Sequence, residues 1–242
     1  MKKLDQGLGI WQILDEAYIT DIIASAGFDL TILDLEHGQH NIGTIKNCVY
    51  AAKSSSIKTI VRVPQIFYQN VVQLIDSDID GLLYPHVETS DELDKIIKQT
   101  LLAPKGEKSF SPYVSKYKFG LKKSSLISDP AIGILIESKA SINNIENLFQ
   151  NKFLDFIYFG AYDLSVEIGM PGDIFCDQLK EKLIYVKKVA KIYNKKVFAL
   201  FRNKDELRFL SDLGIEFPIA SVDTSHLLQK LKKEVDEYKK LI

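Results

Sequence analysis

Short apolar runs alternate along the chain with longer segments in which apolar residues recur at helical spacing between charged ones. Each run is rich in Val, Ile, Leu and Phe, which favours a strand, and each longer segment favours a helix. The pattern therefore predicts strands that alternate with helices. The predicted strands are Gly7–Trp11, Leu30–Glu36, Thr59–Val63, Gly81–Val87, Ile132–Glu137, Phe156–Gly160, Val197–Phe201 and Phe217–Val222.

The segments between these strands supply the predicted helices. Three of them open with a residue type that caps helices, namely Asn41, Ser90 and Asp223. The predicted helices are Asn41–Ser54, Tyr68–Asp76, Ser90–Leu102, Lys139–Phe149, Gln178–Tyr193, Lys204–Leu213 and Asp223–Leu241.

The strands are nearly all apolar, which indicates burial on both faces, as in a parallel sheet covered by helices. Eight such units favour an α/β fold of the closed (β/α)₈ TIM-barrel type over an open doubly wound sheet. The chain has 242 residues, close to the typical size of such a barrel. We therefore expect a single domain over residues 1–242.

Composition narrows the range of partners. The net charge of −1 arises from 31 basic and 32 acidic side chains that are mixed along the chain. This balance argues against nucleic acid or a membrane surface as a partner. The two cysteines, Cys48 and Cys176, are far apart and lack neighbouring Cys or His ligands, so no zinc site is predicted. The sequence has no signal-peptide pattern or apolar membrane span, and a cytoplasmic location is the expectation.

One segment interrupts the alternation. Residues 103–129 contain two prolines, two glycines, three Lys-rich patches and interleaved aromatic residues. We interpret this segment as a long βα loop with a functional role, the alternative being an irregular insertion.

Polar residues gather where the predicted strands end, which is where barrels of this kind place their active sites. Glu137 and Asp163 each follow a buried strand and must be paired, hydrogen bonded or bound to a metal. They either cap neighbouring helices or form a hard-cation site that a 2-oxo acid could complete. Arg62 would add positive charge there, unless it forms a salt bridge across the barrel mouth.

A histidine in the same region is a candidate for proton transfer. His37 is flanked by Asp34 and Glu36, and its ordinary pKa suits a general acid or base. His40 and His86 compete with it for this role.

Several motifs together resemble the HpcH/HpaI aldolase family, the metal-dependent class II pyruvate aldolases of the phosphoenolpyruvate/pyruvate barrel superfamily. The resemblance covers nearly the whole chain. The motifs are LDLEHG (33–38), VRVP (61–64), LYPHVETSDE (83–92), IES (136–138), YFGAYDLSVEIGMPG (158–172) and SVDT (221–224).

The resemblance implies a role for each strand-end residue. His37 falls on the family's catalytic acid/base, with Asp34 as its supporting aspartate, and Arg62 falls on the arginine that binds pyruvate. Glu137 and Asp163 fall on the ligands of a divalent metal, Mg²⁺ or Mn²⁺ with Co²⁺ as a further option. The implied chemistry is an aldolase reaction through a metal-bound pyruvate enolate.

The resemblance also implies contacts beyond these five residues. Backbone amides around Gly160, Ala161 and Tyr162 would meet the pyruvate carboxylate. Asp76 falls on an aspartate that acts in a neighbouring subunit's site. A swapped C-terminal helix and a homo-oligomer, either a hexamer or its dimers, are implied as well.

The chain departs from the family pattern near the expected site. Leu135 replaces a common glutamine, Tyr162 replaces a small or acidic residue, and residues 104–110 lack the usual Arg-Gly pair. These departures leave the second substrate open. Three hypotheses follow: a lyase that joins a 2-oxo acid to an aldehyde, the same site used with a partner such as a thioester, and a catalytically silent barrel.

Overall fold

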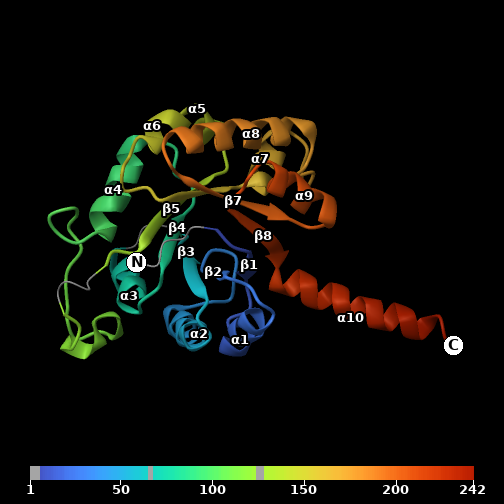
Figure 1. The fold of residues 1–242 in the computed structure, drawn as a ribbon, viewed down its shortest axis with the longest axis horizontal. Helices are drawn as coiled ribbons and strands as arrows, with labels where there is room; N and C mark the ends of the chain where they lie inside the picture. The colour runs from blue at the N-terminus through green and yellow to red at the C-terminus, as the bar shows by residue number, and fades with distance from the viewer. Residues whose placement is uncertain (1–5, 65–67, 124–127) are drawn as a thin grey trace.

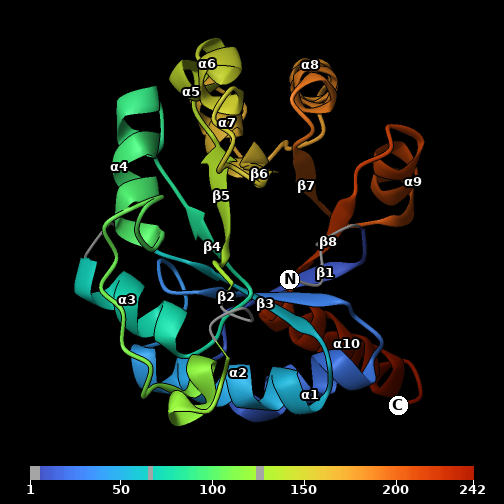
Figure 2. The ribbon, with the colours of Figure 1, turned by 60° about the vertical axis from the view of Figure 1, so that its left-hand side comes forward.

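The chain folds into a closed barrel of eight parallel strands, in the order β1 to β8 with β8 returning to β1. The computed structural model describes residues 6–64, 68–123 and 128–242. Figures 1 and 2 show the helices outside the strands. The predicted (β/α)₈ barrel is confirmed. The strands are β1 (Gly9–Gln12), β2 (Leu30–Asp34), β3 (Lys58–Arg62), β4 (Gly81–Tyr84), β5 (Ala131–Ile136), β6 (Phe156–Phe159), β7 (Lys196–Phe201) and β8 (Phe217–Val222).

Each predicted helix is present, with two more that the prediction did not name, α1 and α7. Asn144 divides the predicted helix 139–149 into two. The helices are α1 (Ala17–Ser25), α2 (Ile42–Ser54), α3 (Tyr68–Asp76), α4 (Ser90–Thr100), α5 (Lys139–Asn143), α6 (Ile145–Phe149), α7 (Ala161–Glu167), α8 (Asp177–Ile192), α9 (Lys204–Asp212) and α10 (Asp223–Lys239), together with the 3₁₀ helix η1 (Ser115–Gly120).

Two of the three predicted helix caps shift by one residue. Asn41 caps α2 as expected, because its side chain accepts the amides of Gly43 and Thr44. Helix α4 is capped by Thr89 instead of Ser90. Asp223 is the first residue of α10, and its carboxylate accepts the amides of Ile13 and Leu14 at 3.0 to 3.2 Å instead of capping the helix.

Aromatic rings fill the barrel interior. Phe156 and Phe198 stack with centroids 4.7 Å apart, and Phe198 and Phe217 stack at 4.5 Å. Gly133 on β5 makes room for them, because a Cβ atom at this position would lie 2.2 Å from the Phe156 ring. The packing thus explains a glycine inside an otherwise apolar strand.

The segment 103–129 differs from its prediction. It follows α4 and precedes β5, so it is an αβ connection and not a βα loop. Its described part contacts the end of α3, where the Lys108 ammonium lies 3.0 Å from the Asp76 carboxylate. Helix α4 already completes the crossover that follows β4, so the segment after it must join a helix to a strand. The prediction did not take this into account. This segment therefore lies at the opposite end of the barrel from the βα loops.

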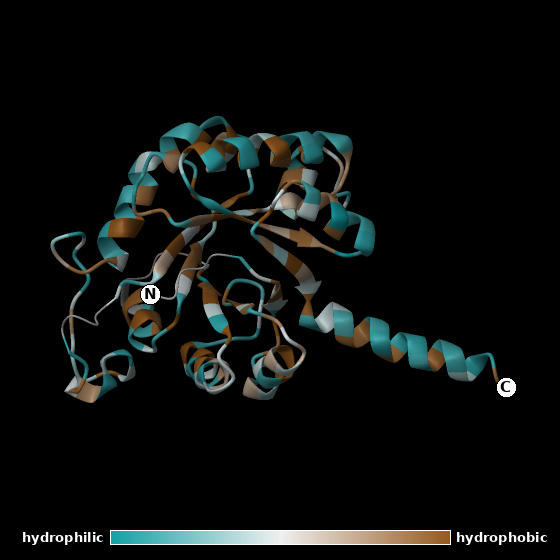
Figure 3. Cartoon of the chain, viewed as in Figure 1, coloured by the Kyte–Doolittle hydropathy of each residue, from teal (hydrophilic) through white to brown (hydrophobic). Residues whose placement is uncertain are grey.

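Helix α10 projects away from the barrel, as Figure 1 shows, and carries an apolar stripe that is visible in Figure 3. Leu228, Leu231, Val235 and Tyr238 recur at alternating spacings of three and four, and each is exposed. Within the described ranges no helix combines the length and apolar character needed to cross a bilayer.

The Gly133 contact gives a test of the interior packing. We expect Gly133→Ala to lower the free energy of unfolding by about 1 to 3 kcal/mol, because the new methyl group overpacks the core. Chemical denaturation measures this. Phe156→Leu in the same chain should recover part of the loss, and a double variant whose loss is the sum of the two single losses would contradict the account.

Candidate active site at the C-terminal ends of the strands

A cavity of about 310 Å³ opens at the C-terminal ends of the strands. Its wall is mostly apolar, with a few convergent charged groups, which is typical of a small-molecule site. Its lining residues come from β1, β2, β3, β5, β6, β7 and β8 and from the loops that follow them. They are Trp11, Ile13, Asp34, His37, Arg62, Leu135, Tyr158, Phe159, Gly160, Ala161, Tyr162, Asp163, Leu200 and Val222.

Asp34 and Arg62 form a bidentate ion pair at the ends of β2 and β3. Arg62 donates from Nε at 2.8 Å and from Nη2 at 2.5 Å to the two Asp34 oxygens. Its Nη1 lies 3.0 Å from Glu36. Burial acts to raise the pKa of Asp34, but the Arg62 hydrogen bonds and charge outweigh it, so this pKa lies below its ordinary value. The pair is therefore charged at neutral pH.

The three candidate histidines occupy different places. The His37 ring faces the cavity, and among the described residues the structure gives this ring no hydrogen-bond partner. Asp34 supports His37 by accepting its backbone N–H at 3.3 Å rather than by contacting its ring. His40 is buried with its Nε2 atom 3.2 Å from the Gln12 carbonyl, and burial lowers its pKa. His40 therefore has a structural role and does not line the cavity.

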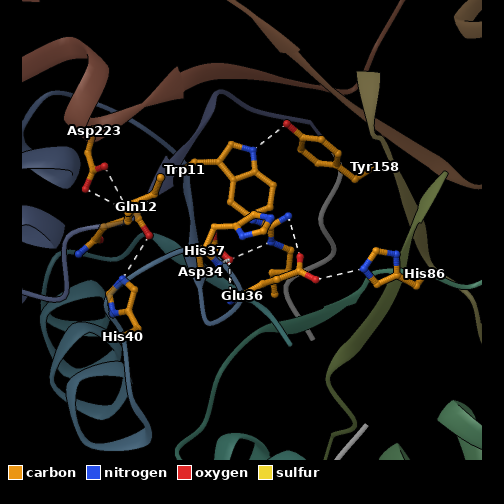
Figure 4. A network of polar contacts seen from close by, with 11 residues as sticks. Trp11, Gln12, Asp34, Glu36, His37, His40, His86, Tyr158 and Asp223 are labelled. Atoms are coloured by element: carbon orange, nitrogen blue, oxygen red, sulfur yellow. Dashed lines mark hydrogen bonds and ion pairs between the residues drawn. The ribbon is translucent and has the colours of Figure 1, made fainter. Parts of the chain in front are cut away.

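His86 touches the site from its edge. Its ring nitrogens lie 3.3 Å from Glu36 and 3.2 Å from Glu137, although the side chain is 69% exposed. Figure 4 shows the ring beside Glu36. Its backbone φ of 57° is left-handed, which is costly for a non-glycine residue. The Glu137 carboxylate accepts the His86 backbone N–H at 2.6 Å and so helps to hold this conformation.

Glu137 follows β5, and Asp163 lies in the first turn of α7, which follows the neighbouring strand β6. Glu137 is 7% exposed, and burial raises its pKa, with a further upward contribution from the charge of Asp163. Gly160 lies against it, because a Cβ atom there would be 2.4 Å from the Glu137 Cβ. Neither carboxylate caps a helix as the first interpretation required. The Ser138 side chain caps α5, and Asp163 lies inside the first turn of α7.

The donor set fits a hard divalent cation. In the part of the chain that the structure describes, no cluster of three or more His, Cys, Asp or Glu side chains could enclose an ion. Two carboxylates alone leave most positions of an octahedral shell to substrate oxygens and water, as is usual for Mg²⁺. Burial and the charge of Asp163 raise the pKa of Glu137, and a divalent cation at this position would favour its charged form.

The predicted backbone amides are only partly available. The Gly160 N–H donates to the Ile136 carbonyl at 2.9 Å and belongs to the sheet. Helix α7 begins at Ala161, so the amides of Ala161 and Tyr162 have no acceptor within the helix. Both residues line the cavity. These two amides, and not the Gly160 amide, can meet an anionic ligand.

Asp76 is the one predicted site residue that lies elsewhere. It ends α3, at the opposite end of the barrel from the cavity, and it pairs with Lys108. Its proposed role in a neighbouring subunit's site stays a prediction.

The sequence reasoning missed Trp11 and Tyr158, which line the cavity. Trp11 is the single tryptophan and stands at the end of the first predicted strand. Since active sites of such barrels lie at the C-terminal ends of the strands, the last residue of that strand was also a candidate for the site. Tyr158 lies inside a strand, where its sequence position gives no signal.

A barrel that gathers an arginine, a histidine and two carboxylates at the C-terminal ends of its strands has the organisation of a (β/α)₈ enzyme. Comparison with known proteins identifies which enzymes it resembles. The family model for HpcH/HpaI aldolase/citrate lyase matches residues 8–226. The chain belongs to this family, and the family's reactions make it a carbon–carbon lyase.

Similar proteins match over almost their whole length. The chain is 24% identical to hydroxypyruvate/pyruvate aldolase from Roseobacter denitrificans, covering 98% of this chain and 96% of that protein. It is 26% identical to 5-keto-4-deoxy-D-glucarate aldolase from Citrobacter koseri, covering 96% and 92%. Its fold matches the crystal structure of citrate synthase SbnG with a TM-score of 0.86 at 24% identity, covering 98% and 94%.

The Asp34–Arg62 pair gives a prediction for stability. We expect Asp34→Asn to destabilise the protein by about 3 kcal/mol at neutral pH, because Arg62 would lose its buried counter-charge. The folded-state pKa of Asp34 lies below its ordinary value of 3.8, so the stability that it contributes is present above that value and is lost as the pH falls below it. Urea unfolding over this range should show the two proteins converging.

The exposed carboxylate of Asp212 offers the matched control. Asp212→Asn should differ little from the wild type at any pH. A gap between Asp34→Asn and the wild type that stays constant down to the lowest pH at which both fold would contradict the account.

Proposed function

We propose that this protein is a metal-dependent aldolase that forms or cleaves a 4-hydroxy-2-oxo acid. The 2-oxo acid partner is pyruvate or a close relative, and the other partner is an aldehyde. The observation that carries the proposal is that Arg62 and Asp163 line one cavity and that the charge of Asp163 raises the pKa of the buried Glu137. Glu137 itself is not among the residues that line the cavity. The aldolase names of the relatives support the same reaction class.

Glu137 and Asp163 would hold Mg²⁺ or Mn²⁺, with Co²⁺ as a further option. When bound, the cation supplies positive charge that stabilises the enolate of the 2-oxo acid without a Schiff base. Arg62 has five N–H donors, of which Asp34 and Glu36 take three. The remaining two can bind an oxygen of the 2-oxo acid.

The other cavity residues divide the remaining tasks. The amides of Ala161 and Tyr162 would bind the substrate carboxylate at the start of α7. The His37 ring would take the proton that the methyl group of pyruvate loses and give it to the aldehyde oxygen as the carbon–carbon bond forms. On cleavage the same proton would move in the reverse direction. Asp34 keeps the loop of His37 in place through its backbone contacts.

The wall beyond these groups limits the second substrate. Ile13, Leu135, Leu200 and Val222 give the cavity an apolar side. Leu135 stands there instead of an amide side chain, so this position offers no hydrogen bond to a hydroxylated aldehyde. A small aldehyde with an apolar substituent fits this side best.

A second candidate keeps the site and changes the partner to a thioester. The match in fold to citrate synthase SbnG over nearly the whole chain supports it. Product analysis separates the two candidates: incubation with pyruvate and an aldehyde should give a 4-hydroxy-2-oxo acid. Product only from oxaloacetate and acetyl-CoA would favour the second.

The metal site is tested by exchange of pyruvate methyl protons in deuterated water, followed by proton NMR. The Mn²⁺-loaded protein should catalyse exchange, and removal of the metal should abolish it. Glu137→Gln and Asp163→Asn should each lower the exchange rate by more than about 100-fold, because each removes a charged ligand.

Glu167→Gln is the matched control, since Glu167 lies on α7 one turn after Asp163 and outside the cavity. It should exchange like the wild type. If the wild type shows no exchange with any of the three metals, the enolate chemistry is refuted. If Glu137→Gln retains full metal binding and exchange, the catalytically silent barrel or a different site must be preferred.

The protein is further proposed to be a homo-oligomer, a hexamer or its dimers, in which α10 packs on a neighbouring subunit. The exposed stripe Leu228, Leu231, Val235 and Tyr238 has the spacing of a helix–helix seam. In such an assembly Asp76 would serve a neighbouring subunit's site.

The apolar stripe gives a test of this assembly. Leu231→Glu combined with Val235→Glu should reduce the mass measured by light scattering, because two charges would be buried in the seam. Lys233→Glu, on an exposed position of the opposite face of the same helix, should leave the mass unchanged. An unchanged mass in the double variant would exclude this helix from the interface.

A further inference from the structure

Trp11 on β1 and Tyr158 on β6 meet across the interior of the barrel. The indole Nε1–H donates to the Tyr158 hydroxyl at 2.7 Å, and the rings meet edge to face with centroids 5.2 Å apart. The strands β1 and β6 are not neighbours in the barrel, so this contact spans its mouth. Both side chains are almost fully buried, at 6% and 4% exposure, yet both line the cavity. Figure 4 shows the pair above Asp34 and Glu36.

Trp11 also contacts the substrate-binding arginine. The guanidinium carbon of Arg62 lies 4.6 Å from the Trp11 ring centroid, within range of a cation–π interaction. Asp34 holds one edge of the same guanidinium through two hydrogen bonds. The plane and the position of Arg62 are therefore fixed from two directions, by a carboxylate at its edge and an indole ring near its charge.

In the Trp11–Tyr158 pair, the Tyr158 O–H is the one polar group without a hydrogen-bond acceptor among the described residues. An indole N–H can only donate, so the Tyr158 oxygen is the acceptor and its own O–H remains to be placed. Across the described residues the structure provides no acceptor for this hydrogen. A buried hydroxyl without an acceptor costs free energy, so its partner must come from the cavity. Burial raises the pKa of Tyr158, which keeps the hydroxyl protonated.

We propose that Tyr158 is a further catalytic residue, whose hydroxyl donates to an oxygen of the 2-oxo acid beside Arg62, and that Trp11 is the positioning residue for both. This inference rests on the proposed function. The Trp11 N–H directs the Tyr158 oxygen lone pair away from the ligand and its hydrogen toward it. A phenylalanine at position 158 would fill the same space without this donor.

The test compares two conservative variants and their combination. Tyr158→Phe removes the donor, whereas Trp11→Phe removes the indole N–H and keeps the Tyr158 hydroxyl. The Tyr158 hydroxyl would donate a hydrogen bond to a charged ligand, and such bonds are stronger than those between neutral groups. Tyr158→Phe should therefore lower kcat/KM for pyruvate proton exchange by about 10- to 100-fold. Trp11→Phe should lower it only a few-fold. Calorimetry on the Mn²⁺-loaded protein, without turnover, should likewise show a larger rise in the Kd of pyruvate for Tyr158→Phe than for Trp11→Phe.

The alternative is that the hydroxyl serves only to anchor Trp11. In that case the two single variants and the double variant would show equal losses, because all three break the same bond. Equal losses, or a Tyr158→Phe variant that binds and exchanges pyruvate like the wild type, would overturn the proposal. Thermal melting of each variant separates a local loss of binding from unfolding.

Failure of this inference is distinguishable from failure of the proposed function. If the wild type binds pyruvate without exchanging its protons, the enolate chemistry fails, while a weaker Kd in Tyr158→Phe still supports the hydroxyl contact. If the wild type exchanges protons and Tyr158→Phe matches it, the proposed function stands and this inference fails. If the wild type does not bind pyruvate, both fail.

Discussion

The buried ion pair between Asp34 and Arg62 organises the mouth of this barrel. It joins the ends of two neighbouring strands, β2 and β3, with two hydrogen bonds of 2.5 and 2.8 Å. The same carboxylate accepts the backbone N–H groups of Glu36 and His37, so it also shapes the loop that carries the candidate acid/base. Removing one member of such a pair is costly, whereas the intact pair contributes little more stability than apolar side chains would, because both charges lose their hydration. Its value is geometric: it fixes where positive charge faces the cavity.

The site also carries negative charge, on Glu137 and Asp163. Glu137 is buried beside Asp163, and its pKa is raised by burial and by the neighbouring carboxylate. Two acids in such a position are costly alone and become favourable when a cation lies between them and the substrate. In the proposed function, this cavity would bring Arg62 and a divalent cation to the same 2-oxo acid.

Much of this arrangement could be predicted because it depends on local patterns. Apolar runs predicted the strands, and a polar residue at the end of a run, such as Arg62 or Glu137, predicted the C-terminal edge of the barrel. Features that depend on three-dimensional neighbours could not be predicted in this way. The Trp11–Tyr158 hydrogen bond joins residues 147 positions apart. The segment 103–129 is a different case: the predicted helix Ser90–Leu102 already placed it between a helix and a strand, so its assignment to a βα loop was an error of interpretation. The Gly160 amide was counted as a ligand because its bond to Ile136 is invisible in the sequence.

The central claim is that one cavity binds a divalent cation and a 2-oxo acid together. Calorimetric titration of pyruvate into the protein with and without Mn²⁺ tests this most directly. Linkage makes the coupling reciprocal, so a pyruvate that ligates the cation would tighten the binding of Mn²⁺ by the same factor by which Mn²⁺ tightens the binding of pyruvate. The account predicts that Mn²⁺ lowers the Kd of pyruvate at least about tenfold, which corresponds to about 1.4 kcal/mol of coupling. The same Kd with and without Mn²⁺ would contradict it.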